Sequence, residues 1–249
     1  MEEEIKQWWD KDEYEYEFDP YKFPHPNVAV DLVVFGYENP KLKVLLIKRE
    51  NKDRHEGEWI LPGGFIKIKE SAEDAVIRTI KEKIKLTIEI GNINQFHSYS
   101  DYKRDNRERV ISIAYYALVE IRKDESDKTM WVDVNKIPKL PFDHNKIVED
   151  GLIALKNNIF FNPDGTMPDT FKLLPEKFTL TQVQRLYEVI LNVRLDRRNF
   201  YNKMTKLGII EELDETTMTK NNMEAHQFKF NEEKYKELKK TSSGLKFEF

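Results

Sequence analysis

Carboxylates and basic side chains at helical spacing mark the segment from Gly64 to Leu86. Within it, apolar residues between Ala72 and Lys83 recur every three or four positions, which predicts an amphipathic helix with Ser71 as its cap. Positions 79, 82 and 83 of such a helix project from one face. Three carboxylates there could hold magnesium, which prefers hard oxygen ligands and stabilises the charge that develops when water attacks a phosphate.

The sequence supplies only one of those three carboxylates. The positions hold Thr79, Glu82 and Lys83, and Glu82 alone makes a poor magnesium site. The Lys83 ammonium would compete with a cation for the same space or pair with Glu82; alternatively, both side chains are solvated on an exposed helix face. Glu70 and Arg78 are interpreted as an ion pair that ties the preceding loop to the helix. We therefore expect no catalytic residue, no metal and no cofactor.

The same spacing resembles the Nudix box, since Gly64, five residues, Glu70, seven residues and Arg78 lead into a helical continuation. The matching positions are Gly64, Glu70, Arg78, Ile80, Glu82 and Leu86. Thr79, Lys83 and Lys85 depart from the box, and two of these three stand where the family has glutamate. The resemblance implies an α+β fold, namely a Nudix-like α/β/α sandwich with a mixed sheet.

The resemblance also implies a pocket bounded by Gly63 and Gly64, where we expect the glycines to adopt backbone angles that other residues resist. The segment from Arg104 to Arg109 contains three arginines that could bind phosphate or sugar oxygens at the rim. The alternative is a solvated charged loop. Arg49, at the end of a predicted strand, is a similar candidate. The predicted ligand-binding residues are Arg49, Gly63, Gly64, Glu70, Arg78, Glu82, Arg104, Arg107 and Arg109.

The elements that must position this pocket are visible as apolar runs. Extended segments are predicted at 27–35, 42–48, 57–61, 110–121 and 131–132, and a helix at 144–157. We expect an N-terminal arm over 1–24, a Nudix-like ligand-sensing domain over 25–159 and a linker over 160–172, which is rich in turn-forming residues.

A different pattern fills the remaining segment, 173–249. One amphipathic helix is predicted over 180–191, with Thr179 or Thr181 as its cap, and a second over 196–207, with Gly208 as its stop signal. Short strands at 209–210 and 227–230 surround a polar excursion. Helix, helix, strand, loop and strand is the order of a winged helix-turn-helix.

The second of these helices is a candidate for reading DNA. Residues 172–206 contain eight basic and three acidic side chains, enough for several phosphate contacts. The predicted DNA-binding residues are Thr181, Gln182, Arg197, Arg198, Asn199, Tyr201, Asn202 and Lys203. The alternative is the polar side of an ordinary amphipathic helix. The excursion at 214–222 follows several acidic residues, so we do not expect it to enter the minor groove.

Both halves together resemble Nudix-related transcriptional regulators. That resemblance implies a homodimeric, ligand-responsive repressor of pentose or NAD-related metabolism, with double-stranded operator DNA and an ADP-ribose-like or pentose effector as partners. Two alternatives stay open. One is a Nudix hydrolase of ADP-ribose or a related nucleoside diphosphate derivative, which would use Glu82 with a carboxylate from elsewhere such as Glu108. The other is a small-molecule-binding protein whose C-terminal part mediates dimerisation or protein contact instead of DNA binding.

Composition bounds these hypotheses. The 249 residues include no cysteine, which excludes disulfides, thiolate zinc sites and cysteine nucleophiles, and the 5 histidines lack paired ligand spacing. The net charge of −4 argues against nonspecific coating of nucleic acid. No run approaches the roughly 18 apolar residues of a membrane span, and the acidic start is unlike a signal peptide. We therefore expect a cytoplasmic protein with no membrane partner.

Overall fold

The computed structural model describes residues 25–50, 55–85, 93–121, 127–159, 168–219 and 222–241. The predicted arm at 1–24 lies outside these residues. Within them, no helix is long and apolar enough to cross a membrane.

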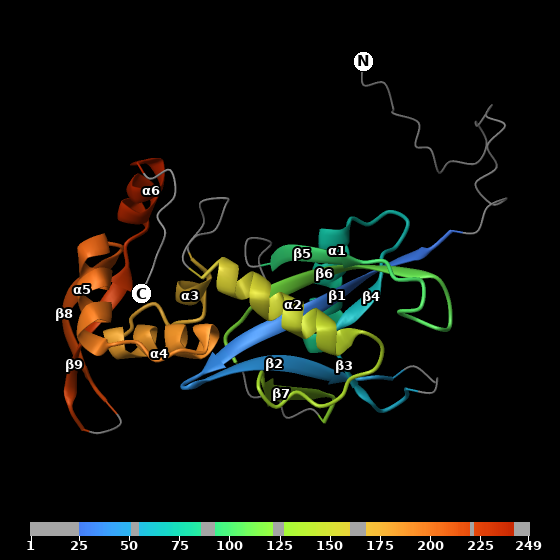
Figure 1. The fold of residues 1–249 in the computed structure, drawn as a ribbon, viewed down its shortest axis with the longest axis horizontal. Helices are drawn as coiled ribbons and strands as arrows, with labels where there is room; N and C mark the ends of the chain where they lie inside the picture. Colours follow the sequence, from blue (N-terminus) through green and yellow to red (C-terminus); the bar gives the residue numbers. More distant parts are fainter. Residues whose placement is uncertain are drawn as a thin grey trace, which may run out of the picture.

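A seven-stranded sheet forms the first half of the fold (Figure 1). Its strands are β1 (Asn27–Glu38), β2 (Lys41–Lys48), β3 (Trp59–Ile60), β4 (Gly63–Phe65), β5 (Ile93–Tyr99), β6 (Val110–Leu118) and β7 (Thr129–Asp133). The central order is β3-β2-β1-β6-β5, with β4 added to β1 and β7 to β2. Because β1 and β6 run parallel and the other pairs antiparallel, the sheet is mixed, as predicted.

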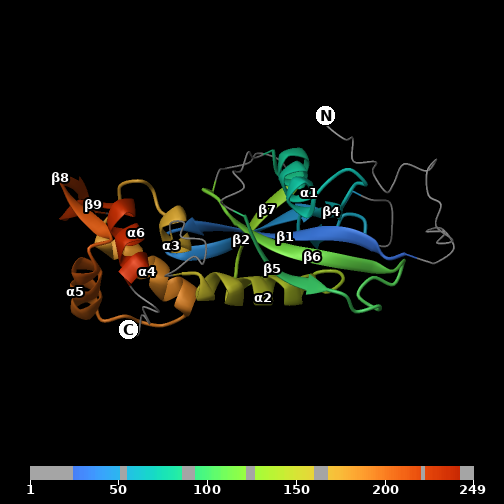
Figure 2. The same ribbon diagram turned by 90° about the horizontal axis from the view of Figure 1, so that it is seen from above.

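Helices cover both faces of this sheet (Figure 2). On one face lies α1 (Ala72–Thr79), which continues as a π-helical turn, η2 (Ile80–Ile84), and on the other lies α2 (His144–Asn157). The period of two along β1 serves both cores, since Val30 and Leu32 pack with α1 while Val33 and Phe35 pack with α2. The predicted α/β/α sandwich is therefore confirmed.

The second half is a winged helix, also as predicted. It contains α3 (Asp169–Lys172), α4 (Leu180–Leu191), α5 (Arg197–Leu207), the hairpin β8 (Ile210–Met218) and β9 (Glu224–Phe230), and α6 (Glu232–Thr241). Thr179 caps α4 in a capping box with Gln182, which decides between the two predicted caps. Gly208 ends α5 with a φ of 67°, a conformation that suits glycine.

Three features of this half differ from the sequence prediction. The segment predicted as a linker over 160–172 ends in α3, where Asp169, Thr170 and Phe171 are buried. The hairpin strands are longer than predicted and absorb much of the polar excursion, because backbone pairing continues where few side chains are buried. The final helix α6 was not expected, and its Tyr235 is buried in the core.

The two halves pack into each other at one end of the sheet (Figures 1 and 2). Helix α4 contacts both β2 and α2, and one continuous apolar cluster runs from the α2 face of the sheet into the winged helix. Hydrogen bonds also connect the two halves at this junction. The Tyr116 hydroxyl donates to Asp169 at 2.6 Å and accepts from Asn158 at 2.7 Å, while the Thr170 hydroxyl donates to the Ile159 carbonyl at 2.6 Å.

Candidate functional site

A pocket of about 550 Å³ opens between the sheet and the end of α1, and it collects charge from several chain segments. Its basic lining residues are Lys48, Arg49, Arg78, Lys83, Lys85, Arg104, Arg107 and Lys128. Its acidic lining residues are Asp31, Glu50, Glu82 and Asp105. Eight cationic side chains against four carboxylates make a pocket that favours an anionic occupant.

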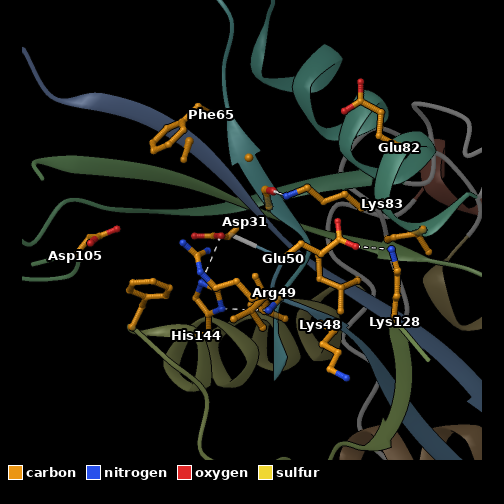
Figure 3. A pocket seen from close by; sticks show the side chains of 18 of the residues that line it. Asp31, Lys48, Arg49, Glu50, Phe65, Glu82, Lys83, Asp105, Lys128 and His144 are labelled. Atoms are coloured by element: carbon orange, nitrogen blue, oxygen red, sulfur yellow. Dashed lines mark hydrogen bonds and ion pairs between the residues drawn. The ribbon is translucent and has the colours of Figure 1, made fainter. Parts of the chain in front are cut away.

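The end of the helix that follows the Glu70 loop, α1, differs from the sequence prediction. An α-helix was expected through Lys83, but the α-helical part ends at Thr79 and a π-helical turn follows. Because the wider turn changes the angle between successive side chains, positions 82 and 83 no longer share one face. Figure 3 shows Lys83 extending toward the centre of the pocket while Glu82 points away from it.

Of the arrangements that the sequence left open for Lys83, a pair with Glu82 is not the one that forms. Its ammonium donates a hydrogen bond to the Gly63 carbonyl across the pocket. Partial removal from water lowers the pKa of Lys83, and the nearby Arg49 charge lowers it further. Glu82 instead lies 3.5 Å from the Arg78 guanidinium.

The ion pair predicted between Glu70 and Arg78 is present. The Arg78 Nε and Nη2 atoms donate to the two Glu70 oxygens at 2.6 and 2.8 Å, and Nη2 also donates to the Phe65 carbonyl at 2.9 Å. The hydrogen bonds from Arg78 lower the pKa of Glu70 to about 2. The pair thus ties the strand–helix loop to α1, and Glu70 itself is not among the pocket-lining residues.

Gly63 and Gly64 line the pocket for a different reason than predicted. Neither has a positive φ. Gly63 lies in β4, so close to β1 that a Cβ atom would come within 2.5 Å of the Asp31 carboxylate and 2.7 Å of the Val30 carbonyl. Close approach of two strands, and not an unusual backbone angle, therefore requires glycine at position 63.

A buried polar network forms the floor of the pocket, and sequence reasoning missed it. Asp31 on β1 accepts hydrogen bonds from Arg104 at 2.9 Å and from Ser112 at 2.7 Å, and Arg104 also donates to both oxygens of Asp143 at 2.8 and 2.9 Å. The only signal was one acidic residue inside an otherwise apolar strand.

Asp31 and His144 titrate away from their usual ranges. Burial alone would raise the pKa of Asp31, but His144, Arg104 and Ser112 together lower it. Burial lowers the pKa of His144, and the Leu61 N–H donates to its Nδ1 at 3.1 Å. A neutral ring that accepts at Nδ1 carries its proton on Nε2, which lies 3.6 Å from Asp31.

One side of the pocket is built around Phe142, whose φ of 58° is uncommon for a bulky residue. The guanidinium groups of Arg49 and Arg107 lie 5.5 and 5.1 Å from its ring centroid, within the range of a cation–π contact. Asp105 holds Arg107 through both carboxylate oxygens, at 2.9 and 2.6 Å. Arg49 and Arg107 thus both line the pocket, and they come from separate loops.

The structure places two other predicted residues away from the pocket. Arg109 donates to the Ser100 carbonyl at 2.9 Å, and Glu108 accepts from the Asn27 side chain; neither lines the cavity. Glu108 is therefore not positioned to complete a metal site with Glu82. Across the described ranges, no group of three or more His, Cys, Asp or Glu side chains could hold a metal ion.

The predicted DNA-reading residues lie on the outer side of the winged helix. On α5, the side chains of Arg197, Arg198, Asn199, Tyr201 and Asn202 are exposed and Lys203 is half-buried, while the buried Phe200 and Met204 anchor the helix. The helix begins at the Asp196 cap, which accepts from the Asn199 N–H at 2.8 Å.

The two predicted residues on α4 differ from those on α5. The Gln182 side chain accepts from the Thr179 N–H at 2.7 Å and so is committed to the capping box, and Thr181 is half-buried. The turn between the helices is fixed by Glu188, which accepts from the Leu195 N–H at 2.9 Å. The wing is acidic, and two of its carboxylates pair with side chains of β9, while Glu215 pairs with Lys177 outside the hairpin.

Comparison with known proteins agrees with both halves of the structure. The NUDIX domain family model matches residues 25–151, and the model of the NrtR DNA-binding winged helix domain matches residues 170–230. An ADPR-responsive transcriptional repressor, NtrR, of Acinetobacter baylyi is 29% identical over 201 residues, which are 78% of each chain. An ADP-ribose pyrophosphatase of Methanocaldococcus jannaschii is 40% identical over 130 residues, which are 51% of this chain and 73% of that protein.

Among solved structures, Shewanella oneidensis NrtR in complex with a 27mer DNA is similar to this chain with a TM-score of 0.69. The two sequences are 26% identical, and the match covers 84% of this chain and 95% of the other. A MutT/nudix family protein of Enterococcus faecalis matches with a TM-score of 0.66 and 26% identity, over 84% and 87% of the two chains. The chain therefore belongs to the Nudix family, in the branch of Nudix-related transcriptional regulators that carry an NrtR-type winged helix domain.

Proposed function

We propose that this chain is a DNA-binding transcriptional repressor whose Nudix domain senses an anionic, ADP-ribose-like effector without hydrolysing it. The observation that carries the proposal is the joint presence of an exposed basic helix on an NrtR-type winged helix and a cationic pocket in a degenerate Nudix domain. The DNA-binding form in this proposal is a homodimer, whose two winged helices would contact the two half-sites of a roughly palindromic operator.

Helix α5 supplies the DNA contacts in this proposal. Its first turn presents Arg197, Arg198 and Asn199 to solvent. In a helix-turn-helix the N-terminal part of the second helix enters the major groove, where arginine can address guanine and asparagine adenine. Gln182 contributes through the α4 cap rather than through a base contact, since its side chain is engaged there.

The pocket favours a phosphate-bearing effector over an uncharged pentose. Arg49, Arg78, Arg104 and Arg107 all line it, and cations outnumber carboxylates two to one. Among the relatives, the Acinetobacter baylyi repressor is named for its response to ADPR, and the Methanocaldococcus jannaschii enzyme for its action on ADP-ribose. The proposed effector contacts are these arginines with Gly63 and Gly64, while Glu70 holds Arg78 in place and Glu82, which points away from the pocket centre, is not among them.

Helix α2 gives the pocket a physical connection to the DNA-binding half. Its N-terminal end carries His144 and follows Asp143, both in the pocket network, and Asn158 at its C-cap bonds to Tyr116 in the junction. A ligand that draws Arg104 away from Asp143 would act on the start of one rigid helix whose other end touches the winged helix. Ligand binding thus favours one arrangement of the two winged helices in the proposed dimer.

A mobility-shift experiment on the DNA upstream of the chain's own gene tests the proposal. In moderate salt, the purified chain should give a discrete shift that ADP-ribose reverses and L-arabinose does not. Arg198→Ala should weaken the shift, whereas Arg109→Ala, which changes an exposed arginine outside both sites, should not. If the folded chain gives no specific shift even at low salt, the proposal that it is a DNA-binding repressor is wrong.

The alternative hypothesis of a Nudix hydrolase has one supporting observation, the 40% identity to a protein named ADP-ribose pyrophosphatase. Against it stand Thr79 and Lys83, which occupy two positions where the Nudix box has glutamate. Magnesium-dependent release of phosphate monoesters from ADP-ribose, abolished by Glu82→Gln, would favour the hydrolase. No turnover above a buffer control would favour the sensor.

A further inference from the structure

The Lys83 side chain is the part of the pocket that departs most from what a metal-dependent site needs. It occupies a box position where the family has glutamate, and the π-helical turn directs it into the pocket (Figure 3). There its ammonium bonds to the Gly63 carbonyl, an oxygen of the loop that bounds the pocket. A positive charge bound to a hard oxygen is the arrangement that a divalent cation would otherwise adopt.

We propose that the Lys83 ammonium takes the place of a divalent cation and binds the diphosphate of the effector directly, so that recognition needs no metal. This inference rests on the proposed function for the identity of the effector. It concerns the phosphate chemistry of the pocket alone, so it can be tested apart from DNA binding.

The geometry leaves Lys83 able to bind a ligand. An ammonium has three N–H donors, and one of these donates to Gly63. The side chain is partly exposed and lines the cavity together with Arg49 and Arg78. Lysine acts on phosphate as a point charge, whereas arginine adds a two-pronged contact. A diphosphate lying among these three groups would receive both kinds of contact.

The charges around Lys83 also favour an anion. Burial lowers the pKa of Lys83 most, Arg49 and Arg78 lower it further, and Asp31 and Glu82 oppose them. A bound diphosphate would replace repulsion between neighbouring cations by attraction, and it would raise the Lys83 pKa toward its ordinary value. Binding of the anion and the charged form of Lys83 therefore favour each other.

The same substitution explains why a bound pyrophosphate would stay intact. Hydrolysis in a site of this kind needs a metal that activates water and neutralises developing charge. Lysine supplies a charge but cannot bind and activate water as a Lewis acid does. Glu82, which would have to serve as a metal ligand, points away from the pocket centre and toward Arg78. The lysine thus makes the site a receptor for the substrate of its enzymatic relatives.

Isothermal titration of the full chain with ADP-ribose and, separately, with sodium pyrophosphate tests the inference. Each titration is run in EDTA and in Mg²⁺. The wild-type dissociation constant should be the same in both. Lys83→Met should weaken binding roughly 10-fold or more in EDTA, as loss of a charge-assisted hydrogen bond predicts. Lys83→Glu should weaken it further in EDTA and regain affinity when Mg²⁺ is added.

Lys81→Met is the matched control. It removes a lysine from the same turn, and Lys81 is exposed and does not line the pocket. Its affinity should equal that of the wild type. Circular dichroism and operator binding without ligand should be unchanged in all three variants, which separates a binding defect from misfolding.

The outcomes distinguish the two proposals. Wild-type binding that requires Mg²⁺, or Lys83→Met binding as tight as wild type in EDTA, overturns the role of Lys83. Metal-free, lysine-dependent binding of pyrophosphate without binding of ADP-ribose supports the lysine site and overturns the proposed effector. If neither probe binds in EDTA, the inference fails, while operator binding is judged on its own.

Discussion

Arg104→Met is the substitution whose effect the structure determines most directly. The Arg104 side chain is only 6% exposed and lies between Asp31 and Asp143. It donates three hydrogen bonds of 2.8 to 2.9 Å to these two carboxylates. Methionine fills similar space without charge, so the variant leaves the Asp31 carboxylate buried with Ser112 and the His144 ring as its partners.

The expected cost is about 3 kcal/mol of unfolding free energy. Removing one partner of a buried ion pair typically costs about 3–5 kcal/mol, because the other charge is left uncompensated. We take the lower end because Ser112 still donates to Asp31 and because Asp143 is 21% exposed and can be hydrated. For a chain of this length, 3 kcal/mol corresponds to a fall of roughly 6–12 °C in melting temperature.

Urea unfolding at pH 7, followed by tryptophan fluorescence and by circular dichroism, measures the cost. Arg109→Met is the control, since that exposed arginine makes one bond to a loop carbonyl and its loss should change the free energy by less than about 0.5 kcal/mol. Adding Asp31→Asn to Arg104→Met removes the stranded charge, so the double variant should be more stable than Arg104→Met.

The sign of the pH dependence gives a second check. In the wild type the pKa of Asp31 is lowered, so its contribution is present above its unfolded pKa and lost as pH falls through the folded value. In Arg104→Met burial dominates and raises that pKa, so the penalty grows as pH rises. The difference between wild type and variant should therefore shrink from pH 7 to pH 4. A cost below about 1 kcal/mol, or a constant difference across that range, would refute the reasoning.

Gly63→Ala should lower the melting temperature by several degrees, at a cost of about 1–3 kcal/mol, because a Cβ there would lie 2.5 Å from an oxygen of β1. Gly64→Ala, whose nearest contact is 3.4 Å, should not; equal values in scanning fluorimetry would contradict this. Arg198→Ala should reduce the slope of log operator affinity against log salt by about 1, and an unchanged slope would exclude phosphate contact. Tyr116→Phe should cost about 1–2 kcal/mol in urea unfolding, because its hydroxyl is bonded at the domain junction; no change would mean that this junction bond contributes nothing. The Glu70 carboxyl should titrate near pH 2 in carbon-13 NMR, against an ordinary value of 4.5, so its stabilising contribution is complete above the ordinary value and is lost as pH falls from there through about 2; titration near 4 would show that its arginine pair is not formed.

Most of the elements could be predicted because they depend on local patterns, whereas β5, α3 and α6 were not predicted. The capped helices at Ser71 and Thr179 have the chemistry of capping boxes, and the apolar period of β1 is what a strand covered on both faces requires. The Glu70–Arg78 pair followed from the spacing within one motif. These are short-range signals, and each of them has a direct physical cause in neighbouring residues.

The floor of the pocket could not be predicted in the same way. Asp31, Arg104 and Asp143 come from three distant segments, and only the parallel pairing of β1 with β6 and the packing of α2 bring them together. The π-helical turn after Thr79 was not predicted either, and it separates the directions of Lys83 and Glu82, which an α-helix was expected to place on one face. Sequence spacing identified the positions that matter but gave the wrong geometry for two of them.

The effect of an effector on operator affinity cannot exceed the effector's own preference for one arrangement of the two winged helices. To lower operator affinity 100-fold, an effector must prefer the non-binding arrangement by about 2.7 kcal/mol. The pocket has groups that can supply such a preference, because the Arg104 guanidinium that could meet a phosphate also bonds to Asp143 at the start of α2. The junction can convey it, because Asn158, Tyr116 and Asp169 form one hydrogen-bonded chain between α2, the sheet and α3. A phosphate that competes for Arg104 would change the contacts at one end of α2, and the rigid helix would carry that change to the residues that orient the winged helix.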